Sequence, residues 1–202
     1  MKHVFWITMI CVVLGAGAIG AENGPSPAPA RPKLLDQLRA GPMAGVTDLV
    51  FAARKMNDTD GHWFANIGYY AHDPGRKACR EGTKLYRWNL VTGKLTTLLN
   101  DPRGGVRDPQ VNYDGKTILF SYRKGGTEHY HLYEMQTDGS GLIQLTDGNY
   151  DDFEPNYMPD GDIVFVSTRC RRWVNCWLTQ VAILHRCARN GHNIHPISRR
   201  HT

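Results

Sequence analysis

The feature that most constrains this chain is an internal repeat. The segment DPQVNYDGKTILFSYR (108–123) aligns with EPNYMPDGDIVFVSTR (154–169) at a constant offset of 46 residues. Each copy is followed by a second similar segment, HLYEMQTDGSGLIQLT (131–146) or LHRCARNGHNIHPIS (184–198), and KLYRWNLVTGKLTTLL (84–99) repeats that second half upstream. Three imperfect copies are therefore visible, and they indicate a fold built from similar units packed side by side.

Each unit has the pattern of short strands joined by tight turns. The alignment places Ser121 opposite Ser167 and Arg123 opposite Arg169. Asp-Gly and Asn-Gly pairs accept the positive φ angles of hairpin turns, and such pairs separate the apolar runs at Asp114, Asp138, Asp160 and Asn190. Four short strands in a period of roughly 40–45 residues are typical of a propeller blade. We therefore predict an all-β fold, a β-propeller with four-stranded blades, of which about three are present, so that the propeller is partial.

Two other architectures are excluded by the same pattern. A solenoid of helix pairs needs apolar residues at helical spacing, and no stretch after residue 50 keeps that spacing over three turns. A β-sandwich shares the turn spacing of a propeller, but it would not repeat its sequence so faithfully.

The motifs also resemble known families. HLYEM followed by DGSGLIQLT, with a proline shortly before the recurring Asp-Gly pairs, is similar to the blade signature of TolB-type propellers. FAARKMNDTDGHWFANIGYY, DDFEPNYMPDGDIVFVSTRC and WVNCW resemble secreted proteins related to the middle domain of the hydrazine synthase alpha subunit, over roughly residues 46–198. This resemblance implies a propeller and, as one activity, a part in a haem redox enzyme. The haem-bearing parts of that family use C-x-x-C-H attachment sites, which this sequence lacks.

The N-terminal residues have the order of an export signal. Lys2 precedes an apolar run that ends at Leu14, and small residues follow it. The run is shorter than the ~20 apolar residues of a membrane span. We therefore expect a signal peptide at 1–21, a Pro/Ala-rich linker at 22–45 and the partial propeller at 46–202, in a periplasmic or secreted protein with no stable membrane span after cleavage. An uncleaved anchor is the alternative.

Positive charge gathers near the C-terminus. The formal net charge is +5, yet no Asp or Glu follows Asp162, whereas seven arginines do: Arg169, Arg171, Arg172, Arg186, Arg189, Arg199 and Arg200. Such a patch suits an anionic partner. Because an exported protein rarely meets nucleic acid, we expect no nucleic-acid partner, and instead a solvated arginine surface or a segment that lacks its usual partner.

Cys170, Cys176 and Cys187, with His185 close by, form the densest cluster of reactive side chains. Disulfides persist in oxidising compartments, and removal of Cys11 with the signal leaves an even number of cysteines. Structural zinc sites favour C-x₂₋₄-C spacing, which neither interval fits. We therefore expect a disulfide among the three cysteines that staples the loop between them. Free buried thiols and a metal or haem site are the alternatives.

His129 and His131 are candidate binding residues. Alternate residues of a strand share a face, so the two histidines could bind one metal ion. The matching strand at 84–86 carries no ligands, and we expect rim or packing histidines and no metal. The stretch DPRGGVRDP places Arg103 and Arg107 where they could line one mouth of the ring.

The acidic loop TDGNYDDFEP (146–155) gathers Asp147, Asp151, Asp152 and Glu154. Oxygen-rich loops suit calcium, but the EF-hand order is missing, and carboxylates at such junctions commonly accept hydrogen bonds from loop backbone. We count Asp151 and Asp152 among the candidate binding residues and expect no cofactor, with calcium and haem as the alternatives.

No catalytic constellation is visible, because the G-x-S-x-G and H-E-x-x-H patterns are both absent. We therefore expect an exported propeller that binds a protein partner or small ligand and catalyses no reaction of its own. The alternative is a component of a hydrazine-synthase-like haem enzyme. Open strand edges pair readily with other chains, so we expect a protein partner or self-association that completes the propeller.

Overall fold

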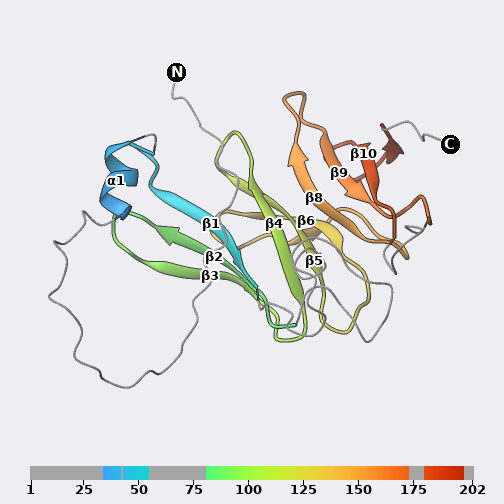
Figure 1. Cartoon of the computed structure of the whole chain (residues 1–202), viewed down its shortest axis with the longest axis horizontal. Helices are drawn as coiled ribbons and strands as arrows, with labels where there is room; N and C mark the ends of the chain where they lie inside the picture. Colours follow the sequence, from blue (N-terminus) through green and yellow to red (C-terminus); the bar gives the residue numbers. More distant parts are fainter. Residues whose placement is uncertain (1–33, 42, 55–80, 173–179, 198–202) are drawn as a thin grey trace, which may run out of the picture.

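The computed structural model describes residues 34–41, 43–54, 81–172 and 180–197. Within them the chain forms a helix, α1 (Leu34–Ala40), and three antiparallel sheets that follow one another across the molecule in sequence order (Figure 1). Sheet 1 contains β1 (Asp48–Ala53), β2 (Lys84–Asn89) and β3 (Leu95–Asn100). Sheet 2 contains β4 (Gly105–Val111), β5 (Thr117–Arg123), β6 (His131–Gln136) and β7 (Ile143–Gln144). Sheet 3 contains β8 (Asp152–Tyr157), β9 (Ile163–Ser167), β10 (Ile183–Cys187) and β11 (His195–Pro196).

The predicted partial propeller is confirmed. Sheets 2 and 3 each have four strands that pair in the order of the sequence, as the strands of a propeller blade do. Sheet 1 has three strands within the described residues, and its β2 and β3 match β6 and β7 in sequence. Strand β1 therefore corresponds to β5, the second strand of a blade.

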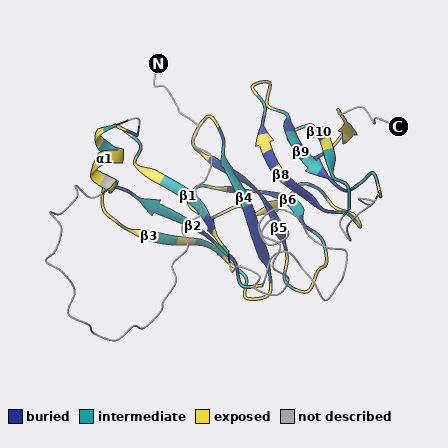
Figure 2. Ribbon diagram, viewed as in Figure 1, coloured by how far each residue is buried: buried dark blue, intermediate teal, exposed yellow. Residues whose placement is uncertain are grey.

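The sheets pack face to face through two apolar clusters. Sheets 1 and 2 bury Ala52, Leu85, Val106, Ile118, Phe120, Tyr122, Tyr133 and Met135. Sheets 2 and 3 bury Leu119, Leu132, Tyr157, Ile163, Phe165 and Cys187. Since alternate residues of a strand face opposite sides, β5 supplies both clusters, and all seven of its residues are buried (Figure 2). Full burial of one such phenylalanine contributes about 1.5–3 kcal/mol, so sheet 2 is the centre of the fold.

The first strands of sheets 2 and 3 share an irregularity that holds them together. The pairing shifts after Arg107 in β4 and after Phe153 in β8. At the following positions, Asp108 and Glu154 adopt positive φ angles of 54° and 52°, which non-glycine residues rarely keep without support. Asp108 Oδ2 supplies that support, because it accepts hydrogen bonds from Glu154 N at 3.3 Å and from Arg107 Nε at 2.5 Å.

The constant offset of 46 residues is wrong beyond this point. The hairpin turn of sheet 2 is closed by a hydrogen bond from Asn112 N to Thr117 O, and that of sheet 3 by one from Met158 N to Asp162 O. The second turn is therefore one residue shorter. Ile163 corresponds to Ile118, as their places in the two apolar clusters also show. The deletion follows the second Asp-Gly pair, where the aligned turn residues conceal it.

This slip of one residue exchanges the two faces of the strand. Ser167 corresponds to Tyr122 rather than to Ser121, and Arg169 does not correspond to Arg123. The Arg123 side chain is buried, with its guanidinium carbon 5.7 Å from the centre of the Tyr130 ring. Arg169 instead forms an ion pair with a carboxylate, as described below.

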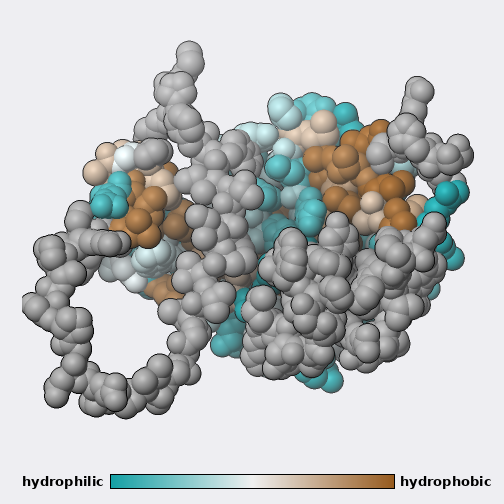
Figure 3. Space-filling view, viewed as in Figure 1, coloured by the Kyte–Doolittle hydropathy of each residue, from teal (hydrophilic) through white to brown (hydrophobic). Residues whose placement is uncertain are grey.

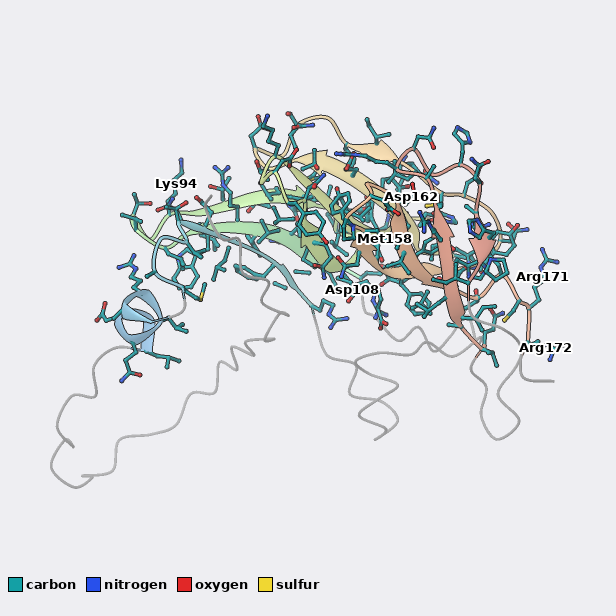
Figure 4. The ribbon with its side chains drawn as sticks, turned by 90° about the horizontal axis from the view of Figure 1, so that it is seen from above. Lys94, Asp108, Met158, Asp162, Arg171 and Arg172 are labelled. Atoms are coloured by element: carbon teal, nitrogen blue, oxygen red, sulfur yellow. The ribbon has the colours of Figure 1, made fainter. Side chains whose placement is uncertain are left out.

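The C-terminal arginines differ from the expected solvated surface. Three of them reach carboxylates on other strands or turns: Arg169 contacts Asp152, Arg186 contacts Asp160 and Asp162, and Arg189 contacts Glu134. Figure 4 shows Arg171 and Arg172 at the opposite end of the row of sheets from Lys94. Three of the five described C-terminal arginines are therefore paired with acidic residues from earlier in the chain, whereas Arg171 and Arg172 are exposed.

Helix α1 lies within the span that we assigned to the linker at 22–45. Its sequence, LLDQLRA, is rich in leucine, glutamine, arginine and alanine, which favour helix. The expected signal peptide at 1–21 lies outside the described residues. Among the described residues, no helix is long and apolar enough to cross a membrane.

Candidate functional site

Three chain connections meet at one end of sheets 2 and 3. Because the strands of each sheet run antiparallel, the β5–β6, β7–β8 and β9–β10 connections all lie at the end where β5 and β9 finish. A pocket of about 540 Å³ opens between them. Its lining is polar, and it consists of Thr127, Glu128, His129, His131, Gly148, Asn149 and Gln180. We call it the histidine pocket.

His129 is held against a buried carboxylate. Its Nδ1 atom lies 3.1 Å from Oδ2 of Asp151, whose side chain is almost fully buried. The other oxygen of Asp151 accepts a hydrogen bond from Tyr130 N at 2.8 Å, so the carboxylate is fixed on both sides. The hydrogen bond to Asp151 raises the pKa of His129; burial opposes this shift, and the negative charges of Asp151, Glu128 and Asp152 add to it.

His131 lies beside a second buried carboxylate, Asp152. Its Nδ1 atom is 3.8 Å from Oδ2 of Asp152. Asp152 is fully buried and accepts hydrogen bonds from Ser167 Oγ at 2.6 Å and Arg169 Nη2 at 2.7 Å. Burial alone would raise the pKa of Asp152, but the neighbouring His131, the hydrogen bond from Ser167 and the guanidinium charge of Arg169 outweigh it and leave the pKa lowered. Each histidine of the pocket thus has a buried acid behind it. Asp151, just before β8, lies behind His129, and Asp152, the first residue of β8, lies behind His131.

Backbone hydrogen bonds fix the segment that carries the two acids. Asp152 N donates to Tyr130 O at 2.8 Å, which joins sheet 3 to the start of β6. Asp151 N donates to Thr168 Oγ1 at 3.0 Å, and Thr168 N returns a hydrogen bond to Asp151 O at 3.1 Å. The backbone that carries both carboxylates is therefore fixed by main-chain hydrogen bonds and by the Thr168 hydroxyl.

The loop at the pocket rim is held by aromatic stacking. Arg169 and Arg171 have their guanidinium carbons 4.4 Å and 5.6 Å from the centre of the Tyr150 ring, and Arg169 Nη2 also donates to Asp147 O at 3.2 Å. Gly148 has a φ of 113°, and a β-carbon there would collide with the Tyr150 ring. Only glycine fits this position without strain, which explains its place in the pocket lining.

The structure brings together four of the predicted binding residues and separates the other two. His129, His131, Asp151 and Asp152 form the histidine pocket and its backing. Arg103 is exposed on the preceding connection, where its side chain lies against Gly125.

Arg107 is buried and lies outside the pocket lining. Its Nη2 atom is 3.3 Å from Glu154 Oε1, and its guanidinium carbon is 5.0 Å from the centre of the Phe153 ring. Arg107 therefore helps to hold β4 against β8. Glu154, from the predicted acidic cluster, is turned toward this contact rather than toward Asp151.

Several residues that line or support the pocket were not predicted. Thr127, Asn149 and Gln180 line the pocket, and Ser167 and Arg169 anchor Asp152. Nothing in their local sequence marks them. Only the correct repeat register would have placed Ser167 beside Asp152, since the two are paired across β8 and β9.

The expected disulfide is not formed by Cys170 and Cys187, which are both free thiols. Cys187 pairs with Ile163 at the start of β9, while Cys170 lies beyond Ser167 at its end. At ~3.3 Å per residue the strand alone separates them by more than ~13 Å, and a disulfide needs α-carbons within ~7 Å. Cys176 lies outside the described residues.

The contacts of Cys187 and Cys170 indicate structural roles for both thiols. Cys187 occupies the core position that Met135 has in sheet 2, and burial raises the pKa of its thiol to about 12, with the charges of Asp152 and Asp162 adding to the shift. Cys170 Sγ donates to Val181 O at 3.1 Å. His185 stacks on Phe165, with 5.8 Å between ring centres. In the described part of the chain, no three His, Cys, Asp or Glu side chains are grouped to hold a metal ion.

The fold and the order of the strands define a partial β-propeller. No protein-family model matches the chain. Over 85 residues, 41% of the chain, it is 36% identical to hydrazine synthase subunit alpha of Kuenenia stuttgartiensis, of which it covers 10%. The solved Kuenenia stuttgartiensis hydrazine synthase is similar with a TM-score of 0.50 and 20% identity, over 69% of this chain and 21% of that chain. A putative TolB from Agrobacterium tumefaciens has a TM-score of 0.46 and 23% identity, over 56% of this chain and 40% of that chain.

The predicted resemblance to the hydrazine synthase alpha subunit is therefore confirmed. This chain spans about a tenth of the hydrazine synthase subunit that it matches in sequence. The comparison shows a common propeller fold over part of each protein.

Proposed function

We propose that this chain is an exported propeller module that binds a small polar ligand in the histidine pocket and catalyses no reaction of its own. One observation carries the proposal. Two imidazoles, each backed by a buried carboxylate, face a cavity of about 540 Å³ at the end of the sheets where three connections converge. Such convergence of a few fixed polar groups in a concave site is typical of ligand pockets.

The pocket chemistry favours a ligand with several hydroxyl, amide or carboxyl groups. The Nδ1 atom of His129 faces a carboxylate and therefore carries a proton, so in the neutral ring Nε2 is an acceptor. Thr127, Asn149 and Gln180 add side chains that both donate and accept hydrogen bonds. Because His129 and the two acids are held by hydrogen bonds before binding, little conformational entropy is lost when a ligand enters.

The experiment is a ligand titration followed at the histidine rings. The probes are citrate, free glutamine and a neutral trisaccharide, and the readout is the ring nitrogen and proton NMR shifts of each histidine. We expect at least one probe to shift the rings of His129 and His131 in a saturable way and to leave exposed His192 unchanged. Saturable shifts that appear only at His192, or shifts at none of the rings, would contradict a ligand site in the pocket.

A matched pair of variants sharpens this test. Asp151→Asn keeps the shape of the side chain but removes the charge that orients His129, and it should weaken binding at least several-fold. Asp147→Asn changes an exposed acid of the same loop and should leave binding unchanged. Equal loss in both variants would mean that general charge, and not the fixed histidines, attracts the probe.

The alternative, a component of a haem redox enzyme, has less support. Similarity to hydrazine synthase subunit alpha is its only basis, and no observation on the described residues favours it. A binding or scaffolding propeller could also have a protein partner. The outer faces of the sheets indicate which partner fits.

A further inference from the structure

The outer face of sheet 3 carries a cluster of aliphatic side chains, with the ion-paired Arg186 of β10 beside them. Val164 and Val166 of β9 lie on it beside Leu184 of β10, and Ile197 follows at its edge. Leu184 is 45% exposed and Ile197 is 46% exposed. Figure 3 shows a continuous hydrophobic area over the strands of this sheet. A cluster of exposed aliphatic side chains on a strand face marks a surface that other protein covers.

The repeat identifies what kind of surface covers this face. In the corrected register, Val164 corresponds to Leu119 and Leu184 corresponds to Leu132. Leu119 and Leu132 are fully buried, because sheet 3 packs on them. The outer face of sheet 3 is therefore the same face that sheet 2 uses to receive the next sheet.

Sheet 1 presents the complementary face. Phe51 and Tyr86 pair across β1 and β2, with 5.6 Å between ring centres, and both are half-buried. They correspond to Phe120 and Tyr133, whose rings lie 6.3 Å apart on the face of sheet 2 that packs against sheet 1. The outer face of sheet 1 thus has the residues with which a sheet packs against its predecessor.

We infer that a second copy of this chain docks its sheet 3 on the sheet 1 of the first, by the same contact that joins sheets 1 to 2 and 2 to 3. The contact joins the Leu184 face of one copy to the Phe51 face of the other. It names the protein partner that the proposed binding function leaves open, and it is independent of the histidine pocket.

Symmetry decides the size of the assembly. A contact between two different faces is heterologous, so it forms a ring if the rotations close and an open filament if they do not. The described residues of each copy form three sheets, and two such sets give about six, within the 4–8 blades of known propellers. A closed dimer with two identical contacts is therefore the expected product.

The experiment measures the native mass of the full chain by light scattering. The wild type should be a dimer from low micromolar concentration upwards. Leu184→Glu places a charge in each contact and should give a folded monomer, as should Phe51→Arg. Ile143→Glu is the matched control, because Ile143 is 58% exposed on β7, away from both faces; it should stay dimeric. A monomeric wild type or an open polymer would overturn the inference.

Mixing the two variants tests the assignment of the faces. In a dimer of Leu184→Glu with Phe51→Arg, one contact is unchanged and the other joins opposite charges, so the mixture should recover the dimer mass. Ile197→Glu provides a second variant of the sheet 3 face in case Leu184→Glu fails to fold, as judged by circular dichroism. A mixture that stays monomeric would mean that the two faces do not meet. Because this readout is mass, it can fail while ligand binding in the pocket succeeds, and the reverse.

Discussion

The two junctions between sheets have the same backbone plan and different chemistry. Between sheets 1 and 2, Val106 lies opposite Tyr122 and both join the apolar cluster. Between sheets 2 and 3, the corresponding positions are Asp152 and Ser167, which are hydrogen-bonded at 2.6 Å. An apolar pair in one junction is thus replaced by a buried carboxylate with a hydroxyl donor in the next.

The neighbouring position changes in the same direction. Gly105, beside Tyr130 at the first junction, corresponds to Asp151, which holds His129 at the second. Two successive replacements therefore convert a packing contact into the backing of the histidine pocket. The comparison teaches that the same backbone scaffold carries a buried acid and its hydroxyl donor at one junction and an apolar pair at the other.

The largest expected effect comes from making the second junction like the first. Asp152→Val introduces the residue found at position 106 and leaves Arg169 and Ser167 without their acceptor. Removing one partner of a buried ion pair costs about 3–5 kcal/mol, and we expect a loss of that size in the free energy of unfolding measured with urea. Asp160→Asn removes an exposed partner of Arg186 and should change the urea midpoint far less. A loss below about 1 kcal/mol for Asp152→Val would show that the junction tolerates an apolar pair.

The next largest effects should come from truncating Met135 and Cys187, which occupy corresponding core positions in the two junctions. Met135→Ala should cost about 2–5 kcal/mol, because it leaves a cavity in the cluster between sheets 1 and 2. Cys187→Ala removes only one buried heavy atom and should cost about 1–2 kcal/mol. Urea unfolding of both variants checks the order. An equal or larger loss for Cys187→Ala would show that its thiol does more than pack.

Thiol chemistry tests the same position independently. Because burial raises the pKa of Cys187 to about 12, almost no reactive thiolate exists at pH 8. A thiol reagent should modify Cys170, which is partly exposed, and should reach Cys187 only after unfolding. Mass spectrometry of digested protein distinguishes the sites. Rapid modification of Cys187 in the native chain would contradict its core placement.

The strands and their order were predictable because their signals are local. Asp-Gly turns and apolar runs lie within a few residues of one another, so the repeat identified the four-stranded sheets directly. The register of β9 was not predictable in this way. One residue is missing after Gly161, and the serine and arginine that match beyond the slip, Ser121 with Ser167 and Arg123 with Arg169, made the wrong alignment look consistent.

The individual residues of the site could be predicted from the sequence, but their arrangement in space could not. His129 and Asp151 stood out separately, and nothing in the chain between them shows that they touch, since the contact joins the start of one strand to the approach of another sheet. The absence of a Cys170–Cys187 disulfide has the same origin. Cys170 and Cys187 are near in sequence, but antiparallel pairing of β9 and β10 carries them apart.

The loss of stability at acidic pH should depend on the first junction. Tyr122 donates a 2.6 Å hydrogen bond to Asp101, which also accepts one from Gly125 N. Burial opposes these bonds, but together they lower the pKa of Asp101. A lowered pKa contributes stability above the unfolded value that is lost as pH falls through the folded one. Tyr122→Phe should cost about 1 kcal/mol at pH 7 and progressively less as the pH falls below the ordinary aspartate pKa of ~3.9. A constant cost from pH 7 to pH 2.5 would exclude the Asp101 bond as its origin.

The pH dependence of stability around neutral pH should depend on the second junction. It is the smallest effect that we expect. Asp151, Glu128 and Asp152 surround His129 and raise its pKa above the unfolded value of ~6.5. A raised pKa contributes stability that is complete below the unfolded value and is lost as pH rises through the folded one. His129→Gln should therefore destabilise the protein by no more than about 1 kcal/mol at pH 5.5, given partial exposure, and by progressively less towards pH 8.5. Urea unfolding across this range measures the difference, with His192→Gln as the exposed control that should show no such trend. A difference that grows with pH would mean that the neutral ring, and not the ion pair with Asp151, holds the pocket together.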